Sequence, residues 1–158
     1  MLMPPTLEKL KTLQLWGMLA ALEDQQRTPD IDSLTFEERL GLLIDREDTM
    51  RADRRLRTRL TQAKLRVKAS IEDIDYRAKR GLSKAAMLDL AQGRWIEERH
   101  NLLITGPTGV GKTYLACALG NQACRHGKRA QYQRLPRLLH ELEIGKGDGR
   151  YQSLLAGL

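Results

Sequence analysis

Apolar residues recur every three or four positions along roughly the first 95 residues, the spacing of a helix with one buried face. The pattern predicts a helix that begins near Thr6. After a break or turn at Gly17, it predicts a second helix that ends before the loop at 28–30. The expected inward-facing positions are Leu7, Leu10 and Leu13 in the first helix and Met18, Leu19 and Leu22 in the second.

The third predicted helix has a specific start signal. Thr35 precedes Glu38 by three residues and apolar positions follow at once, which is the pattern of a capping box. This helix is expected to extend to about Val67, a span long enough to bend or break. A shorter helix is predicted at 85–90, where Ser83 marks its start and Gly93 its end.

The chain changes in character after residue 100. The apolar run 101–105 fits a buried strand or a buried helix by periodicity alone, and the glycine-rich loop that follows it favours a strand. A helix is predicted at 114–126 with Gly127 as its C-cap, then a second strand at 130–133 and a helix opened by Pro136. The predicted fold class is an N-terminal all-α domain, residues 1–95, followed by a partial α/β P-loop NTPase domain, residues 96–158.

The glycine-rich loop matches the pattern G-x-x-x-x-G-K-[ST] at every fixed position. Gly106, Gly109 and Gly111 let the backbone turn sharply and approach a polyphosphate closely. Successive N–H groups then form a concave nest for an anion, and the next helix adds the positive end of its dipole. Lys112 is expected to reach the β- and γ-phosphates, and Thr113 to offer its hydroxyl to Mg²⁺.

A competing interpretation of this loop is a glycine-rich turn with an incidental lysine. An apolar strand before the loop and an amphipathic helix after it are the context that a P-loop requires, so the pattern favours nucleotide binding. The predicted nucleotide-binding residues are Gly106, Pro107, Thr108, Gly109, Val110, Gly111, Lys112, Thr113 and Tyr114, with Thr113 also the metal ligand.

The positive charge of the chain is concentrated in one segment. The net charge of the chain is +7. Residues 51–68 hold eight basic residues and a single acidic one, so the net charge of this segment alone is also +7. On a helix, Arg51, Arg55 and Arg59 share one face at i, i+4 and i+8, which suits a phosphate backbone. These three arginines are the predicted DNA contacts. The alternative is a solvated face whose acidic partners lie on another helix or subunit.

Other features narrow the class of protein. No run approaches the ~18 apolar residues of a membrane span, and the N-terminus lacks the pattern of a secretory signal. Cys117 and Cys124 are expected to be packing thiols of a reduced compartment, because seven residues of helix separate them by ~10 Å. The three histidines show no metal-ligand spacing. These features predict a cytoplasmic protein without a membrane partner.

The order of segments resembles the IstB-type ATPases, which are helper proteins of insertion-sequence transposition, and more distantly the DnaC-type helicase loaders. The resemblance covers nearly all 158 residues. It includes the arginine-rich segment and the motifs Leu15-Trp-Gly-Met18, Leu34-Thr-Phe-Glu-Glu38, Ile71-Glu-Asp-Ile-Asp-Tyr76, Trp95-Ile-Glu-Glu98 and Leu102 to Thr113.

The resemblance implies a member of the AAA+ class that binds ATP and Mg²⁺ through residues 106–113. It also implies self-oligomers that assemble on duplex DNA and cooperate with a transposase, with the arginine-rich segment helping to hold the DNA. In AAA+ sheets the P-loop strand sits between two strands that come later in the chain. By this resemblance, the strand expected at 102–105 has neither of these neighbours within residues 1–158.

The chain departs from the family pattern in one respect. An ATPase of this class also needs an apolar strand that ends in two acidic residues, and residues 114–158 contain none. The expectation is therefore a fragment or truncated gene whose activity as an enzyme is uncertain. The alternatives are a helicase loader, a small-molecule kinase and a non-catalytic DNA-binding remnant. The kinase is disfavoured because about 95 residues precede the strand expected before the loop, whereas such kinases usually open with that strand.

Overall fold

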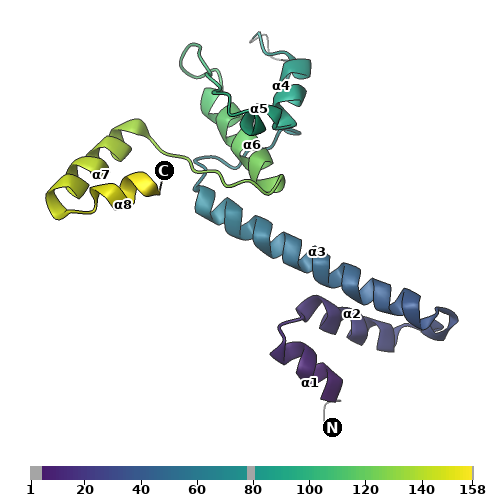
Figure 1. Cartoon of the computed structure of the whole chain (residues 1–158). Coiled ribbons are helices and arrows are strands. Elements are labelled where there is room, and N and C mark those ends of the chain that lie inside the picture. Colours follow the sequence, from purple (N-terminus) through teal and green to yellow (C-terminus); the bar gives the residue numbers. More distant parts are fainter. Residues whose placement is uncertain (1–4, 78–80, 158) are drawn as a thin grey trace. The chain divides into compact units, whose positions relative to one another are not determined.

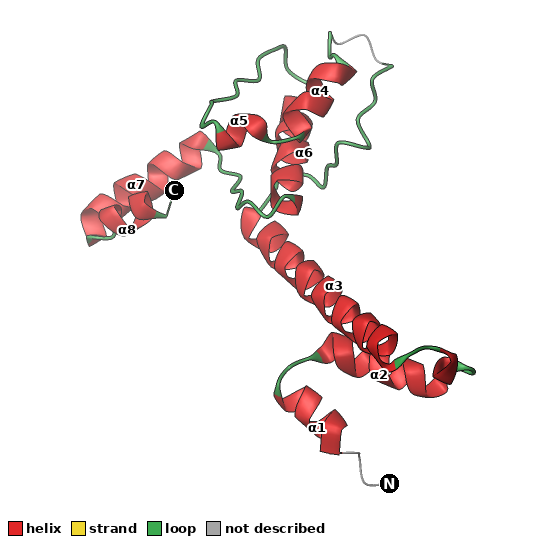
Figure 2. Ribbon diagram, turned by 45° about the vertical axis from the view of Figure 1, so that its right-hand side comes forward, coloured by secondary structure: helices red, strands yellow, loops and turns green. Residues whose placement is uncertain are grey.

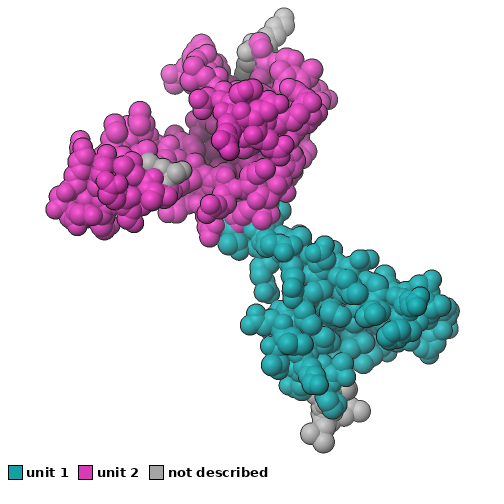
Figure 3. All heavy atoms as spheres, in the orientation of Figure 1, with its two compact units in different colours: residues 1–58 teal, residues 59–158 magenta. Residues whose placement is uncertain are grey.

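The computed structural model describes residues 5–77 and 81–157, and the chain divides into two compact units, residues 1–58 and 59–158 (Figures 1 and 3). All regular structure in the described residues is helical (Figure 2). The helices are α1 Pro5–Thr12, α2 Trp16–Arg27, the 3₁₀ helix η1 Ile31–Ser33, α3 Phe36–Ala63, α4 Lys84–Ala91, α5 Arg94–Glu97, α6 Lys112–Arg125, α7 Leu135–Asp148 and α8 Tyr151–Ala156. The predicted domain boundary at 95/96 stays a prediction.

Two helix start signals of the sequence, at Thr35 and Ser83, are confirmed. The capping box forms at the start of α3: the backbone N–H of Thr35 donates to Glu38 Oε2 at 2.8 Å, and the N–H of Glu38 donates to Thr35 Oγ1 at 3.3 Å. The helix continues for 28 residues without a break and ends at Ala63, four residues before the predicted end. Ser83 caps α4 by accepting from the backbone N–H of Ala86 at 3.3 Å.

The predicted break at Gly17 is wrong. Gly17 lies inside the first turn of α2, where it is buried against the backbone of α3. A Cβ atom at this position would lie 2.5 Å from the Cα of Glu47 and 2.7 Å from the carbonyl oxygen of Arg46. The glycine therefore permits close approach of two helices, a long-range role that a local reading of the sequence interpreted as a turn.

Glu47 of α3 caps the start of α2 from a distance in sequence. Leu15 is the N-cap residue of α2, and its side chain makes no hydrogen bond to the first turn of the helix. Instead, Glu47 Oε2 accepts from the backbone N–H of Gly17 at 2.7 Å and of Met18 at 3.2 Å, and its Oε1 accepts from Arg51 Nε at 2.6 Å. The carboxylate is buried, with 8% of the residue exposed. It thus places a negative charge at the positive end of a helix and satisfies two free donors there.

The pKa of Glu47 lies below its ordinary value. Burial is the largest single influence and raises the pKa, but the bond from Arg51 and the two backbone N–H bonds together outweigh it. Because the folded pKa is depressed, the unfolded chain binds the proton more readily. The carboxylate therefore contributes stability above the unfolded glutamate pKa of ~4.3, and this stability is lost as the pH falls through the lower folded value.

We expect Glu47→Gln to flatten this acid limb of the stability curve. Urea denaturation from pH 7 down to pH 3 measures it, with the free energy of unfolding compared between wild type and variant at each pH. Glu38, whose pKa is also lowered by the backbone and side-chain bonds from Thr35, titrates in both proteins, so the difference between the curves reports on Glu47. Two parallel curves would show that Glu47 does not stabilise the fold through its charge.

The second unit is built around α6. Its core contains Cys117, Ala118 and Leu119 of that helix together with Ala69, Ile71, Ile74, Met87 and Ala91. Asn121 of α6 donates to the carbonyl oxygen of Ala69 at 2.7 Å and Arg125 contacts Glu72 at 2.7 Å, which joins the segment after α3 to α6. Both cysteines are free and fully buried, and burial raises the pKa of the Cys124 thiol, as expected for packing thiols.

The predicted partial α/β fold is not confirmed, because neither predicted strand forms in the described residues (Figure 2). A strand requires a neighbour that accepts and donates its ladder bonds. Residues 101–105 have none, and Leu103 is 86% exposed. In 130–133, the backbone N–H of Tyr132 donates to the carbonyl oxygen of Ala63 at 2.8 Å, so this segment is bonded to the end of α3 rather than to a sheet.

The C-terminal end of α6 and the start of α7 follow their sequence signals. Gly127 adopts φ of 81° directly after α6, as expected of a C-cap glycine, and Pro136 lies in the first turn of α7. The short helices α5 and α8 were not predicted. Helix α8 packs on α7 at Gly145, which leaves room for Leu154. A Cβ atom at residue 145 would lie only 2.6 Å from Cδ1 of Leu154.

Candidate functional site

The loop at 106–111 has a backbone that only glycine adopts readily. Gly106, Gly109 and Gly111 have φ angles of 147°, 84° and 98°, all in the region that side chains disfavour. No atom outside the adjacent residues lies within 4 Å of a Cβ placed on Gly109, so its backbone faces open space. The loop is therefore shaped by its three glycines and presents accessible backbone to a ligand.

Helix α6 begins directly at the end of this loop. Gly111 is its N-cap, and no side chain bonds the N–H groups of the first turn from that position. The carbonyl oxygen of Gly111 accepts from Leu115 at 3.0 Å, so the helix is regular from its first residue. A helix of 14 residues whose first N–H groups lack a capping side chain provides donors and a partial positive charge for an anion.

Lys112 lies folded over the loop. Its Nζ donates to the carbonyl oxygens of Gly106 at 2.8 Å and Pro107 at 2.6 Å, and the side-chain contact is exposed to solvent. Both acceptors are neutral. A phosphate oxygen forms a stronger, charge-assisted bond with an ammonium group, so these two bonds hold the lysine at the mouth of the loop without competing strongly with a phosphate.

Thr113 and Tyr114 follow Lys112 in the first turn of α6. Thr113 is half-buried, and the ring of Tyr114 packs against the core of the unit. Thr113 supplies one hydroxyl oxygen, which fits the way Mg²⁺ is usually held beside a nucleotide, by one or two protein groups together with phosphate oxygens and water. Among the described residues no group of three or more acidic, histidine or cysteine side chains forms an independent metal site.

The three arginines predicted to contact DNA all lie on α3, and two of them have well-defined partners within the chain. Arg51 is bonded to Glu47, and Arg59 Nε donates to the carbonyl oxygen of Cys124 at 2.9 Å, at the C-terminal end of α6. Arg55 is only loosely paired, with its Nη2 3.8 Å from Asp48 Oδ1. Of the three, Arg55 is therefore the arginine with the most freedom to contact a ligand.

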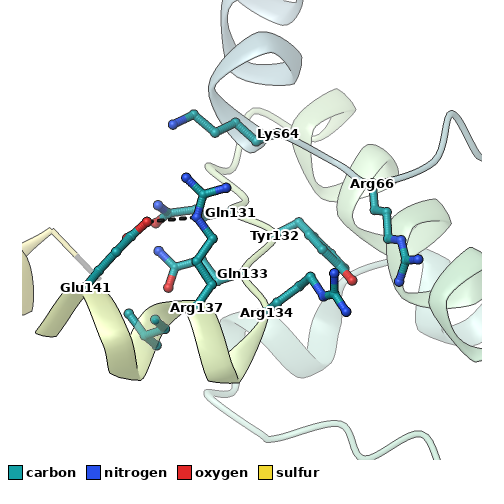
Figure 4. Close-up of a pocket in the computed structure, with 9 residues that line it drawn as sticks. Lys64, Arg66, Gln131, Tyr132, Gln133, Arg134, Arg137 and Glu141 are labelled. Carbon is teal, nitrogen blue, oxygen red and sulfur yellow. Dashed lines mark hydrogen bonds and ion pairs between the residues drawn. The ribbon is translucent and has the colours of Figure 1, made fainter. Parts of the chain in front are cut away.

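The structure adds a basic cluster that sequence reasoning missed. Lys64 and Arg66, which follow α3, lie around one cavity with Arg134 and Arg137 at the start of α7 (Figure 4). About 70 residues separate the two pairs in the chain. No local pattern links them, so only the position of α7 beside the end of α3 reveals the cluster.

Each helix within residues 5–77 and 81–157 is too short or too polar to cross a membrane.

The loop and the helix behind it define the class: this is a nucleotide-binding protein of the P-loop type with a helical region ahead of the loop. The family model described as IstB-like ATP binding protein matches residues 8–158. The chain belongs to the IstB-like ATP-binding protein family.

Curated relatives agree with this assignment. The chain is 53% identical over 154 residues to an ATP-binding protein of insertion sequence IS1162 from Pseudomonas fluorescens, covering 97% of this chain and 67% of the relative. It is 49% identical to an insertion-sequence ATP-binding protein of Sinorhizobium fredii, covering 98% and 63%. A relative of the same description from Mycobacterium tuberculosis is 35% identical, covering 92% and 58%. The chain thus spans about two thirds of the length of these relatives.

Proposed function

We propose that this chain is an ATP-binding helper of insertion-sequence transposition that acts on duplex DNA together with a transposase. The observation that carries the proposal is the loop 106–111 at the head of α6, with Lys112 at its mouth. The names of its relatives, which describe ATP-binding proteins of insertion sequences, support the biological setting. Because the chain spans about two thirds of the length of these relatives, the transposase and DNA are proposed as its partners.

In the proposed mode of binding, the chain surrounds a triphosphate with donors. The N–H groups of the loop and of the first turn of α6 would bond the phosphate oxygens, as they do where a glycine-rich loop leads into a helix. Lys112 would hold the β- and γ-phosphates, and the hydroxyl of Thr113 would hold Mg²⁺. The triphosphate would bring the negative charge that Lys112, the helix dipole and Mg²⁺ together neutralise.

DNA contact is proposed for the basic half of α3. Arg51, Arg55 and Arg59 are the predicted contacts, and Arg55 has the weakest internal partner. A row of guanidinium groups attracts the phosphate backbone without reading bases, so binding should be independent of sequence and sensitive to salt. A DnaC-type helicase loader shares the ATP site and differs only in its protein partner, and the insertion-sequence names of the relatives favour the transposase.

The coupling of ATP to DNA tests this proposal. We expect ATP with Mg²⁺ to tighten binding to a duplex by a factor within the range of ~5–150 that is typical of coupled sites. Arg55→Gln should lower the slope of log affinity against log salt by ~0.9, the effect of one lost phosphate contact. Fluorescence anisotropy with two unrelated duplexes measures both, and Arg129→Gln, an exposed arginine of the second unit, is the matched control.

Two results would contradict parts of this proposal. Equal affinity with and without ATP would favour the DNA-binding remnant, in which nucleotide and DNA are not coupled. If neither Arg55→Gln nor Arg129→Gln changes the slope of log affinity against log salt, then the arginine row contacts protein and not DNA.

A further inference from the structure

A cavity of about 350 Å³ lies in the second unit between the end of α3 and the start of α7 (Figure 4). Most of the residues that line it carry charged or amide side chains, and Tyr132 and Leu138 add apolar surface. The charged groups around it are Lys64, Arg66, Arg134, Arg137 and Glu141, and Gln131, Tyr132 and Gln133 complete much of the wall. All four basic residues are exposed.

Within the part of the chain that the structure describes, three of the four cations have no hydrogen-bond or ion-pair partner. Arg137 Nε is bonded to Glu141 Oε1 at 2.8 Å, and this uses the one carboxylate of the lining. No hydrogen bond or ion pair joins the side chains of Lys64, Arg66 and Arg134 to any other described residue. Cations that the fold brings together without counter-charge repel one another, and an anion between them relieves this repulsion.

The backbone holds the two sides of the cavity in place. The N–H of Tyr132 donates to the carbonyl oxygen of Ala63, the last residue of α3, so the segment before α7 is tied to the residue before Lys64. Arg134 is the N-cap of α7, and Arg137 lies in its first turn. The positive end of a 14-residue helix therefore borders the cavity beside the unpaired cations.

We propose that this cavity binds phosphate groups of a duplex DNA backbone, as a second DNA contact separate from the arginine row of α3. The inference rests on the proposed function, because it takes DNA as the partner. The four basic side chains are exposed, so they can reach a polyanion that extends past the cavity, such as a nucleic-acid backbone. The guanidinium groups bond phosphate oxygens, and the glutamines add neutral donors. The site reads no bases.

The test compares two triple variants of equal charge. The cavity variant carries Lys64→Gln, Arg66→Gln and Arg134→Gln. The control variant carries Lys9→Gln, Arg27→Gln and Arg129→Gln, three exposed cations that lie outside the cavity lining. Both lose three positive charges, so a difference between them reports local contacts rather than net charge. Binding to two unrelated duplexes is measured by fluorescence anisotropy between about 50 and 200 mM salt. Over this range, phosphate contacts change the affinity strongly.

The cavity variant is expected to lower the log–log salt slope by up to ~2.7, or ~0.9 for each lost phosphate contact, and to bind more weakly than the control at every salt concentration. Its thermal unfolding should match that of wild type because no hydrogen bond or ion pair joins the replaced side chains to another residue in 5–77 or 81–157. The single variant Arg66→Gln, with an expected loss of ~0.9 in slope, keeps the test valid if the triple variant folds poorly.

The outcomes separate the two proposals. Equal slopes for the cavity and control variants, with DNA bound by wild type, overturn the cavity site and leave the proposed function standing. Failure of wild type to bind any duplex at the lowest salt overturns both proposals.

Discussion

Lys112→Ala is expected to weaken binding of a non-hydrolysable ATP analogue by a factor of about 10 to 150. The reason is the loss of a charge-assisted bond to the β- and γ-phosphates, worth ~1.5–3 kcal/mol. Each 1.4 kcal/mol is a tenfold change in affinity. Titration with a fluorescent analogue in the presence of Mg²⁺ measures the effect. The unfolding temperature should change little, because the two bonds that Lys112 makes within the chain are exposed and end on neutral carbonyls.

Lys9→Ala provides the control for this result. Lys9 is an exposed lysine of α1, in the other compact unit, and its removal changes the net charge by the same amount. Its variant should bind the analogue as wild type does. If Lys112→Ala binds as tightly as Lys9→Ala, then the loop is a glycine-rich turn and the assignment of the nucleotide site fails.

Gly17→Ala should lower the free energy of unfolding of the first unit by about 2–6 kcal/mol. A Cβ atom would lie 2.5 Å from the Cα of Glu47, a backbone atom that moves only if α2 and α3 separate. Overpacking of this kind costs ~1–3 kcal/mol. The separation also lengthens the bonds from the Gly17 and Met18 N–H groups to Glu47, and a buried acceptor that loses its donors costs a further ~1–3 kcal/mol.

Gly41→Ala is the matched control on α3. No atom lies within 4 Å of a Cβ placed there, so alanine fits and improves the intrinsic helix propensity by roughly 0.5–1 kcal/mol. Urea denaturation followed by Trp16 fluorescence reports on the first unit when all variants carry Trp95→Phe. Opposite signs for the two alanine variants are expected. Destabilisation by Gly17→Ala of less than ~0.5 kcal/mol would mean that α2 and α3 adjust without cost, as at an ordinary surface position.

These expectations show how differently two kinds of glycine can be read from sequence. The loop glycines at 106, 109 and 111 form a pattern with a lysine and a threonine, and their spacing alone predicts a phosphate nest. Gly17 stands alone in an apolar stretch, and its neighbour in space, Glu47, is 30 residues away. A local reading interprets it as a break, whereas the structure shows a point of close contact between helices.

The arginines of the basic segment likewise have partners that lie far away in the chain or that local periodicity does not reveal. Helical periodicity correctly places Arg51, Arg55 and Arg59 on one helix, but it contains no information on their partners. The structure pairs Arg51 with Glu47 and bonds Arg59 to the carbonyl oxygen of Cys124, one residue before the end of α6. Whether these side chains also bind DNA stays a prediction that the variants above test.

By itself, the sequence determined the features that depend on neighbours in the chain. The capping box at Thr35, the end of α6 before Gly127, the P-loop and the family all follow from residues close to one another. Only the tertiary structure decided the features that need a distant partner. Residues 101–105 do not form the expected strand because a strand is stabilised by a neighbour and not by its own residues. The same holds for two further features. The Glu47 cap exists because α3 packs against the start of α2, and the basic cavity exists because the end of α3 lies beside the start of α7.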